Sequence, residues 1–207
     1  MKTTPGKDHT KKTAPKPAAR SGARSVPPPK VRVATLWLSG CSGCHMSFLD
    51  LDEWLITLAG QVRLVYSPIA DVKEYPEGVD VALVEGAVAN DEHLHLIRRI
   101  RRRTAHLVSF GDCAVTGNVT AMRNPLRTAE PVLTRAYLEG ADIAAQIPAE
   151  PGILPVLLDR VMPVHEVVPV DTFLSGCPPP ADRIQDVLEQ LLAGKQPVLA
   201  GRDLKAG

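Results

Sequence analysis

Four cysteines are the residues of this sequence best suited to chemistry. They are Cys41, Cys44, Cys113 and Cys177, and the chain contains no other cysteine. The first two lie close together in "SGCSGCHMS", the third lies in "SFGDCAVTG", and the fourth lies in "LSGCPPP". Four thiols could serve as a redox dithiol, a zinc site or an iron–sulfur ligand set, or they could be inert residues of a core.

The spacing and neighbours of the cysteines favour an iron–sulfur cluster. A redox dithiol would use only Cys41 and Cys44 and would leave the other two unexplained. Structural zinc usually takes two close-spaced pairs, whereas this chain has one pair and two distant single cysteines. Inert thiols would lie in apolar runs, but these lie in turns rich in Gly and Pro. Glycine lets backbone N–H groups approach the sulfurs, and Cys-Pro is a familiar cluster ligand. We therefore expect Cys₄ ligation of one [4Fe–4S] cluster, with zinc and dithiol chemistry as alternatives.

The segments between the cysteines predict an α/β domain with a doubly wound parallel sheet. Apolar runs typical of buried strands alternate with segments of helical spacing. Strands are predicted over residues 31–38, 62–66, 79–86, 105–111 and 164–171, and helices over 47–59, 91–103 and 181–192. Each cysteine motif follows a predicted strand. Because ligands bind outside the carboxyl ends of the strands in such sheets, we expect the four thiols to converge there.

Two regions depart from this alternation. Residues 112–160 are rich in Gly, Pro, Asn and Thr, and they contain only short candidate helices near residues 131–138. Such a long, loop-like excursion is usually functional or covered by a partner. Residues 1–30 hold eight Lys or Arg residues against one acid, with no aromatic residue and no apolar periodicity. We expect a disordered basic tail that binds no nucleic acid, followed by one domain over residues 31–207.

The composition excludes several other classes of protein. Hydrophobic residues make up 44% and charged residues 23% of the chain, which is normal for a globular protein. No run approaches the roughly 18 apolar residues that would suggest a membrane-spanning helix. The first thirty residues show neither a secretory signal nor a twin-arginine motif. We therefore expect a cytoplasmic protein without membrane contact.

Four segments taken together resemble the small subunit of a nickel–iron hydrogenase. They are "LWLSGCSGCHMSFLDLDE", "ALVEGAV", "SFGDCAVTGN" and "LSGCPPPADRI", and they occur in that order within residues 31–193. More narrowly, they are similar to the short small subunit of the soluble, bidirectional, NAD-linked type. The resemblance implies a flavodoxin-like domain whose four cysteines hold the proximal [4Fe–4S] cluster. It also implies a large subunit that carries the Ni–Fe centre, and diaphorase subunits that bind flavin, NAD and iron–sulfur clusters. The implied activity is that of hydrogen dehydrogenase (H₂:NAD⁺ oxidoreductase), with no catalytic residue on this chain itself.

The departures from the family pattern narrow this expectation. Longer, exported small subunits carry a second domain with ligands for two more clusters, whereas this chain ends thirty residues after Cys177 with no cysteine left. One cluster and the cytoplasmic class are therefore expected. The alternative is the homologous cluster-bearing subunit of NADH:quinone oxidoreductase, which typically carries two adjacent cysteines. Here Ser and Gly separate Cys41 from Cys44, and no membrane-docking run is evident, so hydrogenase is favoured.

Two more side chains and one cofactor are candidates for the same site. Glu85 ends a buried predicted strand beside Gly86, and its carboxylate either has a site role, in the cluster surroundings or at a subunit interface, or simply caps the next segment. His45 follows a predicted ligand, where many family members have a Glu nearby, and it could hydrogen-bond near the cluster or merely open a helix. FMN could occupy a flavodoxin-like crevice by analogy of fold alone, since the chain lacks a dinucleotide fingerprint.

Overall fold

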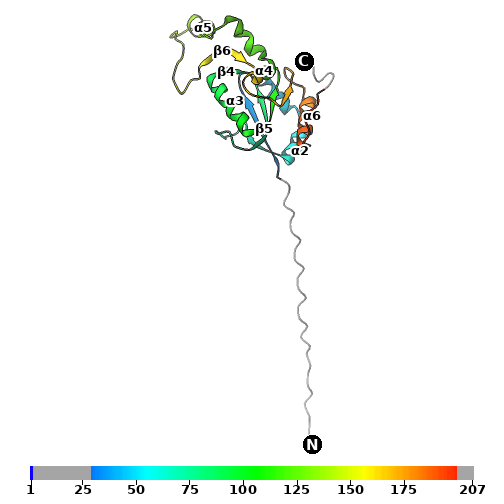
Figure 1. The fold of residues 1–207 in the computed structure, drawn as a ribbon. Coiled ribbons are helices and arrows are strands. Elements are labelled where there is room, and N and C mark those ends of the chain that lie inside the picture. Colours follow the sequence, from blue (N-terminus) through cyan, green and yellow to red (C-terminus); the bar gives the residue numbers. More distant parts are fainter. Residues whose placement is uncertain (2–28, 200–207) are drawn as a thin grey trace.

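A five-stranded parallel sheet forms the centre of the molecule. The computed structural model describes residues 1 and 29–199, so almost all of the predicted tail lies outside the described residues. The sheet is built from β1 (Val31–Trp37), β2 (Val62–Tyr66), β3 (Val79–Glu85), β5 (Thr104–Phe110) and β7 (Thr172–Leu174). All neighbouring strands are parallel, and their order is β2-β1-β3-β5-β7 (Figure 1). This is the doubly wound order of flavodoxin-like sheets, and it confirms the predicted fold class.

Helices cover both faces of this sheet. The helix α3 (Asp91–Arg103) packs on one face, and α2 (Trp54–Gln61) and α6 (Ala181–Leu192) pack on the other (Figure 1). On the first face, Ile97 and Ile100 of α3 are fully buried against strand residues. Since the central strands are buried from both sides, they appear in the sequence as continuous apolar runs rather than as alternating ones.

The predicted strand over residues 164–171 is wrong. That segment begins with a short 3-10 helix, η3 (Val164–Glu166), and the last strand of the sheet starts only at Thr172. Pro163 and Pro169 flank the helical turn, and proline offers no N–H to a strand ladder. The apolar residues of this segment are buried because they pack against the α3 face of the core, not because they extend the sheet.

The predicted helix over residues 47–59 is in fact two helices. The first, α1 (Gly43–Leu49), begins inside the C-x-x-C motif, and α2 follows after a turn. Asp52 lies in that turn with φ +47°, a left-handed conformation that a continuous right-handed helix cannot contain. The second helix ends at Gln61, two residues beyond the predicted end. Because α1 begins at Gly43, four residues earlier than predicted, Cys44 lies in its first turn.

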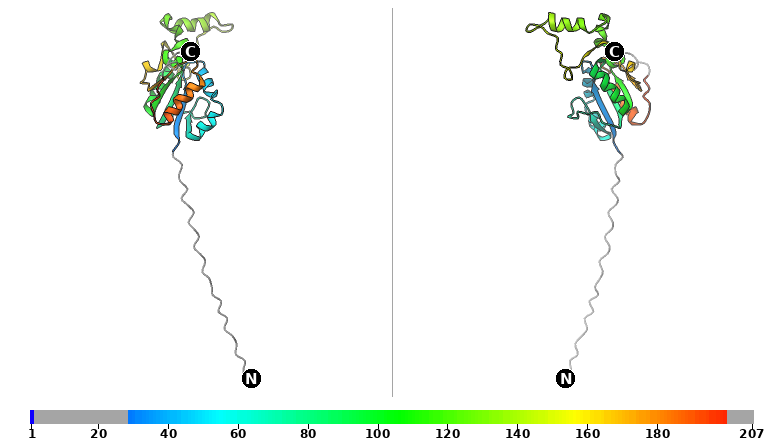
Figure 2. Two further views of the ribbon diagram at one scale, coloured as in Figure 1. Left: turned by 90° about the vertical axis from the view of Figure 1, so that its right-hand side faces the viewer. Right: turned by 60° about the vertical axis from the view of Figure 1, so that its left-hand side comes forward.

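Residues 112–160 contain more regular structure than the sequence predicted. Four short helices form here: α4 (Asp112–Thr116), the 3-10 helix η1 (Asn118–Leu126), α5 (Glu130–Thr134) and the π-helical η2 (Arg135–Glu139). A strand follows them, β6 (Leu157–Met162), and it pairs antiparallel with β4 (Val88–Asn90). The short helices expected near residues 131–138 correspond to α5 and η2. Figure 2 shows that this excursion stands beyond one end of the central sheet. Among the described residues, no helix is both long and apolar enough to cross a membrane.

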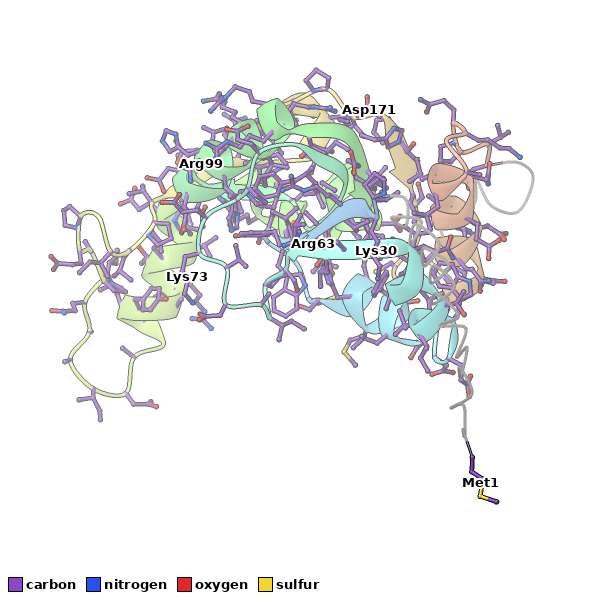
Figure 3. All side chains as sticks on the ribbon, turned by 90° about the horizontal axis from the view of Figure 1, so that it is seen from below. Met1, Lys30, Arg63, Lys73, Arg99 and Asp171 are labelled. Atoms are coloured by element: carbon purple, nitrogen blue, oxygen red, sulfur yellow. The ribbon has the colours of Figure 1, made fainter. Side chains whose placement is uncertain are left out.

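An ion pair that joins α3 to the start of β7 is expected to make stability depend on pH. Arg101 Nη1 lies 2.5 Å from Asp171 Oδ2, which also accepts the Leu107 N–H at 2.7 Å (Figure 3 labels Asp171). Partial burial works to raise the pKa of Asp171, but these hydrogen bonds outweigh it and hold the pKa below its ordinary value. The stabilisation is therefore present above the unfolded-state pKa of about 3.9 and is lost as the pH falls through the native pKa.

We expect Asp171→Asn to cost on the order of 1 kcal/mol near neutral pH, after allowance for solvent screening. The difference from wild type should begin to shrink as the pH drops below about 4 and should vanish once the pH lies below the native pKa. Urea unfolding at a series of pH values measures it. The exposed pair of Asp71 and Lys73 supplies the control, and Asp71→Asn should show no such trend. Equal pH dependence in both variants would contradict the assignment.

Candidate iron–sulfur site

The four cysteines meet at the carboxyl edge of the sheet. Cys41 and Cys44 follow β1, Cys113 lies in the first turn of α4 directly after β5, and Cys177 follows β7. The four thiols are close enough to influence one another, because negative charge on any of the other three raises the pKa of Cys44. The structure thus brings together all four residues singled out from the sequence, although they span 136 positions between Cys41 and Cys177.

Hydrogen bonds join the three loops that carry the cysteines. The Gly176 N–H donates to Asp112 Oδ1 at 2.7 Å, and the Asp112 N–H donates back to the Gly176 carbonyl at 2.9 Å. Ser47 of α1 donates through its hydroxyl to the Pro179 carbonyl at 2.6 Å. Because the loops after β1, β5 and β7 are bonded in this way, the positions of the thiols are set jointly rather than loop by loop.

Glycine allows the closest approach in the site. Gly111, between β5 and α4, has φ +82°, and a Cβ atom at this position would lie 2.1 Å from Cys44 Sγ. A similar contact occurs on the other side, where a Cβ atom on Gly86 would lie 2.7 Å from the Ser39 carbonyl oxygen. Both positions therefore require glycine, for its backbone conformation and for its lack of a side chain.

The electrostatics of the site oppose ionisation of the thiols in the protein alone. Burial first, and then the negative charge of Glu85, raise the pKa of Cys44. Burial also raises the pKa of Cys113, with further contributions from Cys41 and Cys177, while a hydrogen bond from the Val119 backbone acts in the opposite direction. Ligation needs thiolates, so a positively charged metal group would have to supply the compensating charge. Four adjacent thiols with glycine at the contact points fit a metal–sulfur cluster in this respect.

A single metal ion finds less support. Within residues 1 and 29–199, no group of three or more His, Cys, Asp or Glu side chains is arranged to hold a metal ion. A structural zinc site of the kind kept as an alternative needs four such ligands in a tight tetrahedron. Ligation by the four cysteines, whether of a cluster or of a zinc ion, stays a prediction.

Glu85 connects β3 to the first cysteine loop. Its side chain is only 2% exposed. Its Oε1 accepts the Cys44 N–H at 3.3 Å, and its Oε2 accepts the His45 N–H at 3.0 Å and contacts His45 Nδ1. Glu85 therefore caps the start of α1, as one interpretation predicted, and one of the N–H groups that it accepts belongs to a predicted ligand, Cys44. Its role in the surroundings of a cluster stays a prediction.

His45 is held by this carboxylate and by aromatic rings. Its ring packs edge-on against Trp37, with centroids 5.4 Å apart, and lies 5.9 Å from the ring of Phe110. Its Nε2 is buried without a hydrogen-bond partner among the described residues. His45 therefore braces Glu85 and the start of α1 and does not touch the sulfurs through any hydrogen bond in the described structure.

Removal of the Glu85 carboxylate is expected to destabilise the domain. Glu85→Ala leaves the Cys44 and His45 N–H groups buried without an acceptor, and each such group costs about 1–3 kcal/mol. We expect a loss of about 3 kcal/mol in urea unfolding of the reduced chain. Glu77, an exposed acid paired with Arg103, provides the control, and Glu77→Ala should cost below about 1 kcal/mol. Equal losses of stability in the two variants would show that the hydrogen bonds of Glu85 contribute no more than an exposed ion pair.

Two donors to the sulfurs were not found from the sequence. Asn118 Nδ2 donates to Cys177 Sγ at 3.4 Å, and the Val119 N–H donates to Cys113. Both residues begin η1, within the segment expected to be loop-like. The pair Gly117-Asn118 was an available signal, because both residue types favour the left-handed conformations that the structure shows there.

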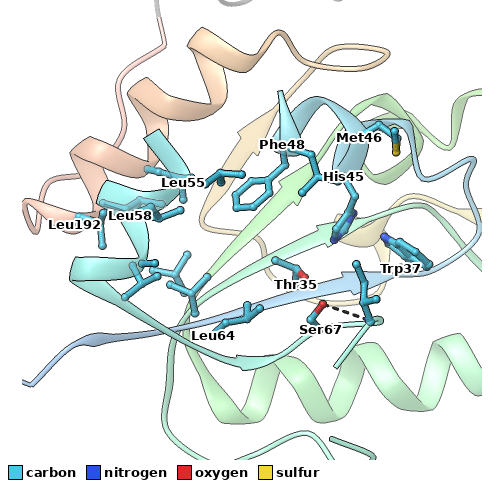
Figure 4. Close-up of a pocket in the computed structure, with 18 of the residues that line it drawn as sticks. Thr35, Trp37, His45, Met46, Phe48, Leu55, Leu58, Leu64, Ser67 and Leu192 are labelled. Atoms are coloured by element: carbon cyan, nitrogen blue, oxygen red, sulfur yellow. Dashed lines mark hydrogen bonds between the residues drawn. The ribbon is translucent and has the colours of Figure 1, made fainter. Parts of the chain in front are cut away.

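An apolar cavity of about 400 Å³ lies beside the site, between the sheet and α1, α2 and α6. Figure 4 shows Trp37, His45 and Phe48 on its wall, with Leu58 and Leu192 farther from α1. Among its lining residues there is no Lys or Arg that could bind a phosphate. The cavity therefore lends no support to FMN, and flavin binding stays a prediction.

The fold and the site together define a class of protein, the flavodoxin-like α/β domain with four cysteines at the carboxyl edge of its sheet. The comparisons with known proteins identify the family. The chain belongs to the family of the NADH ubiquinone oxidoreductase 20 kDa subunit, whose model matches residues 41–191. This match includes all four cysteines, together with Glu85 and η1.

Within that family, the chain is homologous to hydrogenase subunits. It is 41% identical over 170 residues to the NAD-reducing hydrogenase HoxS subunit delta of Cupriavidus necator, which covers 80% of each chain. It is 39% identical to a subunit of the F420-non-reducing hydrogenase vhu of Methanocaldococcus jannaschii, over 82% of this chain but only 58% of that longer protein. A crystal structure of an NAD⁺-reducing [NiFe]-hydrogenase contains a chain that superimposes with a TM-score of 0.80 at 41% identity, covering 86% of this chain and 100% of the other. These findings confirm the resemblance drawn from the cysteine motifs.

Proposed function

We propose that this chain is the electron-transfer small subunit of a cytoplasmic NAD-reducing [NiFe] hydrogenase. One [4Fe–4S] cluster, held by Cys41, Cys44, Cys113 and Cys177, would relay electrons from the nickel–iron centre of a large subunit to a diaphorase module. The observation that carries the proposal is the convergence of four thiols at the carboxyl edge of the sheet. The chain that holds them is 41% identical over 170 residues to the delta subunit of HoxS.

The cluster would supply reversible one-electron chemistry, and the residues of the chain would hold it and set its surroundings. The four cysteines would provide the thiolates. Gly111 leaves room beside Cys44, and Glu85 fixes the backbone from which Cys44 projects. The hydrogen bonds between the loops keep the thiols in place, so that little rearrangement would accompany a change of charge. No residue of the chain is assigned a bond-making step.

Residues 118–156, which lie within the excursion over residues 112–160, support binding of a large subunit. Large apolar side chains are exposed along it, namely Val119, Met122, Leu126, Tyr137, Leu138, Ile143, Ile153, Leu154 and Val156. Exposed apolar surface of this extent usually marks a protein interface. The excursion begins at η1, whose first residue touches Cys177, so a subunit bound there would lie beside the cysteine site. We assign this surface to the large subunit, in keeping with the partner-facing role expected of the segment.

A second candidate function is favoured by the family description. A cluster-bearing subunit of an NADH:quinone oxidoreductase would use the same four cysteines for a different reaction. The relatives described above carry hydrogenase names, and these names support the hydrogenase rather than this alternative.

Anaerobic affinity purification from the native cells tests the proposal. We expect a nickel-containing large subunit and diaphorase subunits to co-purify, with the iron content of one cluster on this chain and H₂-dependent formation of NADH. Iron without nickel or H₂ activity would favour the quinone-linked alternative. A colourless chain that contains zinc and no iron would favour a zinc-stabilised binding module and would contradict the cluster.

A further inference from the structure

The turn before η1 directs hydrogen-bond donors at two of the four cysteine sulfurs. The Asn118 side chain donates through Nδ2 to Cys177 Sγ at 3.4 Å, and the next residue donates its backbone N–H to Cys113. Cys177 is one of the two exposed cysteines of the site, whereas Cys44 is buried. The Asn118 side chain thus supplies a fixed donor to a sulfur that the core does not enclose.

The backbone at this turn is shaped to hold the donor. Gly117 and Asn118 both have positive φ, +86° and +37°. A non-glycine residue rarely adopts this conformation, and Asn is among the few that tolerate it. The turn is anchored on both sides, because the Gly117 N–H donates to the Cys113 carbonyl at 3.0 Å and the Thr120 hydroxyl donates to the Gly117 carbonyl at 2.6 Å. The amide of Asn118 is thus presented to Cys177 by an ordered backbone.

We propose that Asn118 is a positioning residue that raises the reduction potential of the cluster by donating to Cys177 Sγ. The inference rests on the proposed function, since it concerns the same cluster. Reduction adds an electron, and part of its negative charge falls on the cysteine sulfurs. A donor to a sulfur stabilises the more negative, reduced form more than the oxidised form, and hydrogen bonds to sulfur are among the factors that set cluster potentials.

The test is a redox titration of the cluster signal, followed by electron paramagnetic resonance, in the anaerobically purified complex. Asn118→Gly removes the amide and keeps the backbone, because glycine adopts positive φ without strain. If the bond to the reduced cluster exceeds the bond to the oxidised cluster by the net strength of one ordinary hydrogen bond, we expect the ratio of reduced to oxidised cluster at a fixed potential to fall about fivefold. That corresponds to a midpoint about 40 mV more negative, at 59 mV per tenfold change for one electron.

Two further variants make the result decisive. Asn118→Asp also tolerates the left-handed backbone but replaces the donor with a carboxylate, so its midpoint should fall further than that of Asn118→Gly. Asn124→Gly removes an amide of the same helix that bonds to the Val161 backbone and not to a sulfur, and its midpoint should equal that of wild type.

An unchanged midpoint in Asn118→Gly, or an equal shift in Asn124→Gly, would overturn the inference. Failure of both Asn118 variants to assemble a cluster that Asn124→Gly does assemble would also overturn it, because Asn118 would then be structural. Absence of an iron–sulfur signal from the wild-type complex would instead refute the proposed function itself, so the two failures are distinguishable.

Discussion

Gly111→Ala is expected to abolish cluster binding and to destabilise the domain. The added Cβ would lie 2.1 Å from Cys44 Sγ, in the space where two cysteine loops meet. The backbone cannot easily retreat, because the Gly111 N–H donates to the Leu174 carbonyl at 2.8 Å and φ is +82°. The backbone of Gly111, with φ +82° and ψ 163°, lies in a region open essentially to glycine alone, which costs a residue with a Cβ about 1–3 kcal/mol, and displacement of Cys44 adds to this. Iron content and visible absorbance measure the loss of the cluster, and urea unfolding measures the loss of stability.

Gly152→Ala is the matched control for this prediction. Gly152 has nearly the same φ, +80°, but no atom lies within 4 Å of the Cβ that it would gain. This variant should lose about 1 kcal/mol through backbone strain and should keep its cluster. If both variants retained iron to the same degree, the contact between Gly111 and Cys44 would have no part in forming the site.

Cys113→Ser is expected to disconnect hydrogen oxidation from NAD⁺ reduction. Serine has nearly the same shape, so the apo fold should keep its stability, but its hydroxyl is a much poorer ligand for iron than a thiolate. The large subunit should still contain nickel and should still exchange hydrogen isotopes, because that chemistry would not use this chain. The rate of H₂-dependent NADH formation should fall by at least about a hundredfold, as expected when a ligand of an obligatory relay is lost.

Three measurements separate this outcome from general damage. Nickel content and isotope exchange report the large subunit, oxidation of NADH by an artificial dye reports the diaphorase, and the cluster signal reports this chain. Thr116→Ser changes an exposed residue of the same short helix, α4, and should leave all three unchanged. Full H₂-to-NAD⁺ activity with a normal cluster signal in Cys113→Ser would show that the ligand assignment is wrong.

The sheet and the location of the site could be predicted from the sequence because both follow from local patterns. Buried parallel strands are continuous apolar runs, as in Val79–Glu85, and the amphipathic spacing of α6 identifies the face that packs on the sheet. Cys41, Cys44 and Cys113 follow such runs, whereas the strand predicted before Cys177 was placed ahead of β7, so that the edge of the sheet was predicted correctly for Cys177 and its strand was not. The family resemblance, now supported by the comparisons, rested on the same motifs.

Local patterns were misleading where packing against another element decides the conformation. The apolar residues between Pro163 and Pro169 resemble a strand, but they are buried by a helical turn against the α3 face. The helix predicted over residues 47–59 has suitable apolar spacing, yet a left-handed residue at Asp52 divides it. In both cases the period of the apolar residues reports burial correctly and the backbone conformation incorrectly.

The sequence by itself determined the sheet and which thiols gather at its edge; only the tertiary structure decided how the site is completed. Glu85 reaches the Cys44 N–H across 41 positions of the chain, and Asn118 reaches Cys177 across 59. No periodicity records such pairs, because the distance between two side chains depends on how separate loops pack. The physical reason is that strand and helix patterns arise from neighbours within one element, whereas the contacts that position the sulfurs arise only once β1, β3, β5 and β7 lie side by side.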